Sequence, residues 1–283
     1  MARRLISLCH DRELWDSLAN SVVRSATDSG TQVMTKPSYT RLSLAAQDAL
    51  LSQVIARCSR SDGRRTAVVF DLDGTLFENR TRTAAIFQEF AVHLKERGVP
   101  EHEHLERALP TQLGYLVSES LVRLGVTRAE LIAEVESFWR ERFFADAYLR
   151  HDEALAGAVS FARACYEAGA NLVYFTGRDL PKMALGSFAS LRDAGFPIGV
   201  SGTELVLKPT FEMPDEAYKR GSAQELRRSG EPVAFFDNEP GNCNTFLELF
   251  PDATSVFIDT QHAPKAPLLL HGVHVLEDFR RAP

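Results

Sequence analysis

Short apolar runs alternate with helical patterns along most of the chain after residue 65. The runs are continuously apolar rather than alternating in polarity, which is typical of strands in a parallel sheet that is covered on both faces. They occupy 66–70, 170–175, 204–207, 232–236 and 255–258, with 273–276 as a further candidate. Helical patterns lie between most of them, at 153–168, 181–194, 215–229 and 242–250. The alternation predicts a Rossmann-like three-layer α/β/α domain with a mostly parallel central sheet.

The interval from 78 to 150 interrupts this alternation, because it contains helical pattern and no convincing strand. Helices are predicted at 83–96, at 103–124 and from Thr127 to about residue 144, where Thr127 and Glu130 have the spacing of a capping box. An all-helical insertion directly after the first strand predicts a small separate cap domain at 78–150. The α/β core domain would then consist of 66–77 and 151–283.

The first 65 residues differ from the rest. Residues 16–40 are rich in Ser, Thr, Asp and Asn with little apolar periodicity, and we expect them to be loosely ordered. A single amphipathic helix is predicted at 45–57, followed by the polar break SRSDGRR at 59–65. We therefore expect 1–65 to form a partly helical N-terminal extension.

Polar residues directly follow three of the predicted strands. DLDGT follows the first strand at 71–75, TGR follows another at 176–178, and DNEPGN follows a third at 237–242. Ligand sites in open α/β sheets form beyond the carboxyl ends of the strands. We therefore expect these three segments to meet at one edge of the sheet.

The carboxylates in these segments predict a magnesium site. Asp71 and Asp73 flank Leu72, and if both converge on one cleft they repel each other unless a cation lies between them. Together with Asp237 they supply hard oxygen ligands, Asp73 through its carboxylate or its backbone carbonyl, and such ligands suit Mg²⁺. Zinc is disfavoured, because these segments contain no His, and Cys243 is the only Cys close to them.

A magnesium ion beside two aspartates indicates phosphoryl transfer. One carboxylate can attack phosphorus and form an aspartyl-phosphate, while the other exchanges protons with the leaving oxygen and with water. Phosphoryl transfer also needs donors and positive charge around the phosphoryl oxygens. Thr176, with neighbouring backbone N–H groups such as that of Gly177, can supply donors, and Lys208 and Lys219 are candidate cations.

Four ordered segments resemble the motifs of the haloacid dehalogenase (HAD) superfamily of phosphohydrolases. They are VVFDLDGTLFEN (68–79), FTGR (175–178), a downstream lysine and FFDNEPGN (235–242). The resemblance spans roughly 66–258, and the helical interval lies where that superfamily carries its first cap insertion. It implies that Asp71 is the nucleophile and a metal ligand, and that Asp73 is the general acid-base residue with its carbonyl on the metal. It also implies that Thr176 binds the phosphoryl group and that Asp237 is the acidic metal ligand.

The resemblance leaves two positions open. In the third motif Lys219 is favoured, because an aromatic residue precedes it near a helix start; Lys208 is the alternative, or else contacts substrate. In the fourth motif Asn242 stands roughly where a second aspartate is common, and Glu239 lies closer to Asp237, so either can bind the metal or its waters.

The presence of Asp73 favours phosphate esters over dehalogenation, because halide departure needs no such acid.

Several residues are candidates for contact with the substrate. Arg178 can clamp a phosphate or form a surface ion pair. Asn79, with Glu78 and Arg80 beside it, lies in the linker that must pass over the site. Four aromatic residues follow in the cap, and their helical spacing favours a place in the cap core over a pocket wall; they are Phe138, Trp139, Phe143 and Phe144.

Composition narrows the class of protein and its partners. The chain has 283 residues, 45% of them hydrophobic, and a formal net charge of -6, which favours neither nucleic acid nor an anionic membrane. Four widely spaced cysteines predict reduced structural thiols. No apolar stretch reaches the roughly 18 residues of a membrane span, and the run 5–9 is too short for a signal peptide. We expect a cytoplasmic protein that acts on a small phosphorylated substrate.

Four functions are compatible with these motifs. A magnesium-dependent phosphatase is favoured, and a phosphotransferase or phosphomutase would use the same nucleophile. A nucleic-acid end phosphatase resembles this chain in its lysine segment and fourth motif, but the acidic composition and the predicted closing cap disfavour it. A non-catalytic binding protein with the same fold is disfavoured because both aspartates are present.

Overall fold

The structure of the protein is a computed structural model that describes residues 39–59, 63 and 65–282. Of the segment that we expect to be loosely ordered, residues 16–38 lie outside the described residues. Most of the polar break at 59–65 lies outside them as well.

A six-stranded, fully parallel sheet forms the centre of the α/β domain, in the order β5-β4-β1-β6-β7-β8. All six predicted strands are present, with small changes of boundary. Their bounds are β1 (Thr66–Phe70), β4 (Asn171–Asp179), β5 (Thr203–Lys208), β6 (Glu231–Asp237), β7 (Thr254–Ile258) and β8 (His274–Leu276). The Rossmann-like fold predicted from the sequence is confirmed.

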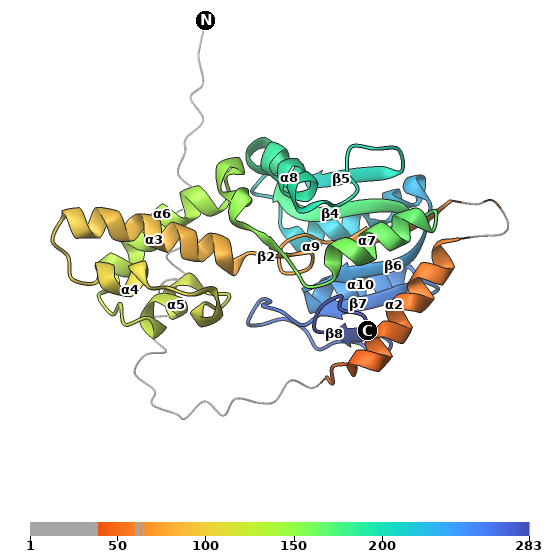
Figure 1. Ribbon diagram of the computed structural model, residues 1–283, viewed down its shortest axis with the longest axis horizontal. Helices are drawn as coiled ribbons and strands as arrows, with labels where there is room; N and C mark the ends of the chain where they lie inside the picture. The colour runs from red at the N-terminus through yellow and green to blue at the C-terminus, as the bar shows by residue number, and fades with distance from the viewer. Residues whose placement is uncertain (1–38, 60–62, 64, 283) are drawn as a thin grey trace, which may run out of the picture. The chain divides into compact units, whose positions relative to one another are not determined.

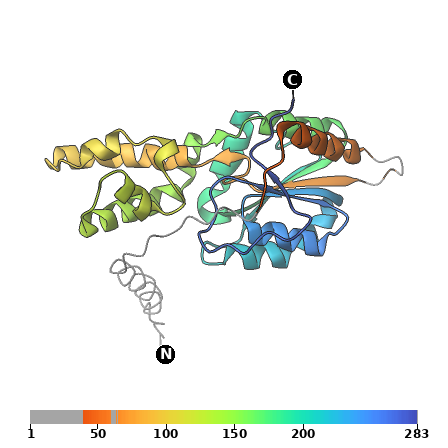
Figure 2. The ribbon, with the colours of Figure 1, turned by 90° about the horizontal axis from the view of Figure 1, so that it is seen from below.

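Helices cover both faces of the sheet, which explains why the strands are continuously apolar. Val68 and Phe70 of β1 pack toward one face, and Ala67 and Val69 pack toward the other. The first face is covered by α2 (Leu44–Cys58), α7 (Ala158–Glu167) and α8 (Leu180–Ala194). The second is covered by α9 (Asp215–Ser222), η3 (Ala223–Ser229) and α10 (Pro240–Leu249). Figure 2 shows the three layers edge-on, with the orange α2 and the blue α10 on opposite sides of the sheet.

Helix α2 belongs to the layered core, although it precedes the boundary expected at residue 65. It confirms the helix predicted at 45–57 and is capped by Ser43, whose hydroxyl accepts a hydrogen bond from the backbone N–H of Ala46. Leu51 and Val54 are fully buried in the same cluster as Phe70. This burial fixes the helix on the sheet.

The segment between β1 and β4 forms a helical unit with its own hydrophobic cluster. Its elements are α3 (Arg80–Glu96), α4 (His102–Glu106), η1 (Pro110–Gln112), α5 (Val117–Arg123), α6 (Ala129–Phe143) and η2 (Asp146–His151). Phe87, Leu94, Leu121 and Val135 are fully buried in its cluster. Figure 1 shows α3 to α6 gathered together beside the sheet domain. We call these helices the cap.

A two-stranded stem connects the cap to the core. Strand β2 (Phe77–Glu78) pairs antiparallel with β3 (Glu153–Ala154), where the chain leaves and re-enters the α/β domain. The expectation that this interval contains no strand was therefore wrong at its first residue, Glu78. The pairing also delays the helix predicted at 153–168, which begins only at Ala158.

Three further helix predictions were wrong in detail. The helix predicted at 103–124 is broken into α4, η1 and α5, because Pro110 cannot continue a helix and holds Leu109 in an extended conformation. Helix α6 begins after Arg128 without a side-chain cap, so the predicted capping box of Thr127 and Glu130 does not form. The helix predicted at 215–229 changes to a 3-10 helix after Ser222.

Two predictions that bear on the class of protein can be compared with the described residues. Cys58, Cys165 and Cys243 are free and buried, as expected for structural thiols, while Cys9 lies outside the described part. None of the helices between 39 and 282 combines the length and the apolar character that crossing a membrane requires.

Candidate active site

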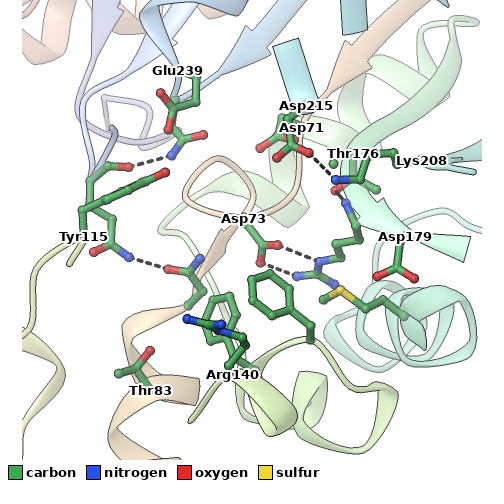
Figure 3. A pocket seen from close by; sticks show the side chains of 18 of the residues that line it. Asp71, Asp73, Thr83, Tyr115, Arg140, Thr176, Asp179, Lys208, Asp215 and Glu239 are labelled. Carbon is green, nitrogen blue, oxygen red and sulfur yellow. Dashed lines mark hydrogen bonds and ion pairs between the residues drawn. The ribbon is translucent and has the colours of Figure 1, made fainter. Parts of the chain in front are cut away.

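The three polar segments meet at the carboxyl edge of the sheet, beside a cavity of about 410 Å³ between core and cap. Figure 3 shows Asp71, Asp73, Thr176 and Lys208 around this cavity. Eight of the predicted site residues line it: Asp71, Asp73, Asn79, Thr176, Gly177, Arg178, Lys208 and Lys219. Asp237, the ninth, is 1% exposed and contacts the site through Lys219.

Lys219 joins the two carboxylates that follow β1 and β6. Its Nζ donates to Oδ1 of Asp71 and to Oδ2 of Asp237, at 2.7 Å in each case, and the ammonium group is buried. The second oxygen of Asp71 accepts a hydrogen bond from the Thr75 hydroxyl at 3.2 Å. We call Asp71, Asp237, Lys219 and the nearby Glu239 the acidic half of the site.

Negative charge exceeds positive charge in the acidic half. Burial raises the pKa of Asp71 to about 7, with Lys219 opposing the shift and the charge of Asp237 adding to it. Burial, together with the charge of Asp237, also raises the pKa of Glu239 to about 7. Three carboxylates thus face one ammonium group, and this oxygen-rich surrounding fits a hard divalent cation.

The side chains alone do not yet form a complete metal site. Within the described residues, no group of three or more His, Cys, Asp or Glu side chains has the arrangement of a metal cluster. Asp71 and Asp237 both point toward Lys219 instead. A magnesium ion would therefore need a further oxygen, and the backbone carbonyl of Asp73 is the one that the sequence predicts.

Asp73 lies in a separate cluster of two aspartates and two arginines, which we call the arginine half. Arg82 donates to Asp73 at 2.6 Å and to Asp152 through two bonds of 2.7 Å. Arg178 donates to both oxygens of Asp73, at 2.8 and 3.0 Å, and to Asp152 at 2.7 Å. The side chains of Arg82, Arg178 and Asp152 are 0% exposed, so the cluster is a buried network.

The arginines set the charge state of Asp73. Burial by itself raises the pKa of Asp73, but the positive charges of Arg178 and Arg82 outweigh it and hold the pKa well below its usual range. The charge of Asp73 does repel that of Asp71, as expected, but it is the weakest of the main influences on the pKa of Asp71. Each has its own cationic partners, and the stronger repulsion on Asp71 comes from Asp237.

The two candidate lysines have different partners. Lys219, on α9, contacts Asp71 directly, whereas the Nζ of Lys208, at the end of β5, lies 2.6 Å from Oδ1 of Asp215. Lys208 remains at the cavity wall. The geometry favours Lys219 for the third-motif role.

The TGR segment continues β4 instead of forming a loop. The register of β4 against β5 shifts between Thr176 and Asp179, so the strand extends to Asp179 with a bulge. A Cβ on Gly177 would lie 2.7 Å from the Asp215 carboxylate, so a larger residue there would displace that side chain, which is 62% exposed. The alternative of a surface ion pair for Arg178 was half right: the residue is ion-paired but only 2% exposed.

The fourth-motif residues contact Asp237 differently. The amide nitrogen of Asn242 donates to both oxygens of Asp237, at 3.1 and 3.2 Å, and so holds that carboxylate in place. Glu239 lines the cavity, where its carboxylate accepts a hydrogen bond from the backbone N–H of Ala263 at 3.1 Å. Asn242 lines the cavity as well, so the negative charge of the carboxylate is what favours Glu239 as the source of oxygen for a metal or its waters.

The contacts of the cap linker are more limited than the sequence predicts. Asn79 lines the cavity, and its side-chain oxygen accepts a hydrogen bond from Gln261 at 2.6 Å. Glu78 and Arg80 are not among the residues that line the cavity, and they pair with each other. The sequence did not identify Arg82 and Asp152 as site residues, because neither lies in one of the four motifs. Arg82 in particular cannot be distinguished from Arg80 in the sequence.

The aromatic residues of the cap divide between two roles. Phe138 packs against the cap cluster as expected and contacts Phe90, with the ring centroids 4.8 Å apart. Phe143 and Phe144 instead line the cavity, and Trp139 contributes to both surfaces. The prediction of cap core was therefore wrong for Phe143 and Phe144, because the end of α6 faces the core domain.

No family model matches this chain, and no curated protein matches it. Similar solved structures include a candidate phosphatase from Clostridium difficile, at 13% identity, 75% coverage of this chain, 94% of that chain and a TM-score of 0.47. A HAD hydrolase of family IA, variant 3, from Entamoeba histolytica is 16% identical, with 76% of this chain and 93% of that chain covered and a TM-score of 0.44. The class C acid phosphatase from Bacillus anthracis with tungstate bound is 16% identical, with 71% of this chain and 66% of that chain covered and a TM-score of 0.38. The chemistry of the site depends on the side chains of this chain.

Proposed function

We propose that this protein is a magnesium-dependent phosphatase of the HAD superfamily that hydrolyses a small phosphate ester through an aspartyl-phosphate. The contact of one buried lysine with two strand-end carboxylates carries the proposal: Lys219 holds Asp71 and Asp237 beside the cavity. The order of the four sequence motifs supports the same assignment of function.

In the first half of the reaction, Asp71 is the nucleophile. A carboxylate oxygen of Asp71 attacks phosphorus, and the bond from phosphorus to the leaving oxygen breaks. The leaving oxygen takes a proton from the acid form of Asp73. Thr176 donates to a phosphoryl oxygen, and Lys219 offsets the negative charge around Asp71. Held by Asp71, Asp237 and the carbonyl of Asp73, Mg²⁺ would neutralise phosphoryl charge.

In the second half, water releases the phosphate. Water attacks phosphorus, the bond to the Asp71 oxygen breaks, and the carboxylate of Asp73 takes the proton of the water. Asp73 is thereby returned to its acid form, so the protons balance over one turnover. Arg82 and Arg178 favour ionised Asp73, which is the form that accepts this proton, so the acid form used in the first half has to be formed by this step.

Phosphate release from a panel of phosphorylated metabolites and oligonucleotide ends, with magnesium and with a chelator, tests the proposal. We expect release only with magnesium, and a loss of about 10⁴-fold or more in Asp71→Asn. Acid-quenched wild-type protein should carry phosphate label from a labelled substrate, and Asp71→Asn should not. Equal release by wild type and variant would refute the nucleophile, and release in chelator would refute the metal.

The same assay separates the remaining candidates. A phosphorylated product in place of free phosphate, when an acceptor alcohol is added, would identify a phosphotransferase. Release only from oligonucleotide ends would identify a nucleic-acid end phosphatase. The cytoplasmic location and the absence of a nucleic-acid partner stay predictions from the sequence.

A further inference from the structure

The cavity has a polar floor and a largely apolar roof. The floor consists of the strand-end side chains of the acidic and arginine halves. The roof comes from the cap, from α8 and from the loop after β5. Its apolar part consists of Leu116, Trp139, Phe143, Phe144, Met183 and Phe211, and the cap adds polar groups through Thr83, Tyr115, Glu136 and Arg140. Since the phosphoryl chemistry belongs to the floor, the roof is the surface that meets the rest of a substrate.

The aromatic rings of the roof contact one another at the cavity wall. Trp139 and Phe143 stack with their centroids 4.5 Å apart, and Phe144 meets Phe211 edge-on at 5.0 Å, which joins cap to core. All four are half-buried. Among the residues described, Phe143, Phe144 and Phe211 belong to no buried hydrophobic cluster. Rings left partly uncovered at a cavity wall suit an apolar or aromatic ligand.

The cavity wall also offers hydrogen-bond acceptors without a partner. In the described part of the chain, Oδ2 of Asp179 and Oε1 of Gln261 are buried and have no hydrogen-bond partner, and both residues line the cavity. Figure 3 shows Asp179 beside the site. Carboxylate and amide oxygens accept hydrogen bonds, so the ligand that satisfies them has an N–H or O–H donor.

We propose that the substrate is a phosphate monoester of a small alcohol that carries an apolar ring and at least one N–H or O–H donor. The proposal rests on the phosphatase function proposed above and names its leaving group. A cavity of about 410 Å³ lies within the size of typical small-ligand sites. Sugars and open-chain polyols fit less well, because hydroxyls placed against the apolar part of the roof would face ring carbons and lose their hydrogen bonds to water.

Non-hydrolysable phosphonates test the leaving group by binding alone. With magnesium present, calorimetry on the wild-type protein should show 2-(4-hydroxyphenyl)ethyl phosphonate binding about tenfold tighter than 2,3-dihydroxypropyl phosphonate. Equal or tighter binding of the dihydroxypropyl compound would overturn the inference. Hydrolysis is measured separately on the corresponding phosphate esters. Tighter binding of the ring compound without phosphate release would count against the phosphatase function, whereas release from both esters with equal affinities would count against the ring alone.

Two phenylalanines near the end of α6 provide a matched pair of variants. Phe144→Leu removes a ring of the roof, whereas Phe138→Leu makes the same change in a ring that packs on the cap cluster. We expect about five- to tenfold weaker binding of the ring phosphonate to Phe144→Leu, with methylphosphonate binding unchanged. Phe138→Leu should bind both as wild type does. Equal weakening in the two variants would assign the effect to cap folding and overturn the role of the roof.

Asp179→Asn tests the donor. Asn caps a helix as well as Asp does, so the hydrogen bond that Oδ1 of Asp179 accepts from the backbone N–H of Lys182 can persist while the acceptor without a partner is lost. We expect several-fold weaker binding of the hydroxyphenyl probe and no change for 2-phenylethyl phosphonate. Equal effects on the two probes would overturn the donor requirement.

Discussion

Asp71 and Asp73 are two residues apart, yet their electrostatic surroundings are opposite. Asp71 shares a single lysine with Asp237, and Glu239 adds a third carboxylate nearby. Asp73 lies between two arginines, and with Asp152 it forms a cluster in which two positive charges balance two negative ones. The acidic half therefore has fewer positive than negative groups, whereas the charges of the arginine half balance one another.

The two halves are also anchored differently. The acidic half belongs to the α/β core, because its side chains come from the ends of β1 and β6, from α9 and from the residue before α10. The arginine half connects core and cap, because Arg82 lies on α3 and Asp152 directly follows η2. We therefore expect metal binding to depend on the acidic half of the site. The surroundings of Asp73 should depend instead on the position of the cap.

After loss of the nucleophile itself, the largest effect is expected from removing the cation of the acidic half. Lys219→Met leaves Asp71 and Asp237 without their shared partner, and the charge of a bound phosphoryl group is no longer offset. We expect kcat/KM for phosphate release to fall by about 10³-fold. Lys208→Met, a matched change in a lysine that pairs with Asp215, should cost less than about tenfold. A larger loss in Lys208→Met would exchange the roles of the two lysines.

In the arginine half, the expected loss is of stability. Arg82→Met leaves the fully buried Asp152 with one arginine, and we expect the free energy of unfolding in urea to fall by about 3 kcal/mol. Arg80→Met, two residues earlier on the same helix, breaks a part-exposed pair with Glu78 and should cost about 1 kcal/mol or less. Adding Asp152→Asn to Arg82→Met should recover part of the loss. No recovery would show that Arg82 acts through packing rather than charge.

The sequence predicted the acidic half more fully than the arginine half, for a physical reason. Asp71 and Asp237 directly follow apolar strands, so parallel pairing brings them to one edge wherever the strands are recognised. Arg82 and Asp152 lie 70 positions apart, and only the packing of the cap on its stem joins them. The fold was predictable for a similar reason: the buried strands are continuous runs, whereas the helices of the cap depend on local breaks such as Pro110.

Metal binding should distinguish the halves directly. Saturating magnesium is expected to stabilise the protein by about 1 to 3 kcal/mol, measured by thermal unfolding with and without the ion. Asp237→Asn should abolish this shift, because it removes a ligand. Asp152→Asn should keep the shift, although it destabilises the metal-free protein. Loss of the shift in Asp152→Asn would show that the two halves are not independent.

The smallest effect concerns the residue that completes the acidic half. Glu239→Gln removes one of three crowded carboxylates, so we expect the metal-free protein to become slightly more stable. The same change should weaken magnesium binding by about tenfold, because a charged oxygen near the ion is lost. Glu136→Gln, a matched change in a cavity-lining residue of the cap, should leave magnesium affinity unchanged. Unchanged affinity in Glu239→Gln would leave the side-chain oxygen of Asn242 as the remaining fourth-motif candidate, and Asn242→Ala should then lower the affinity.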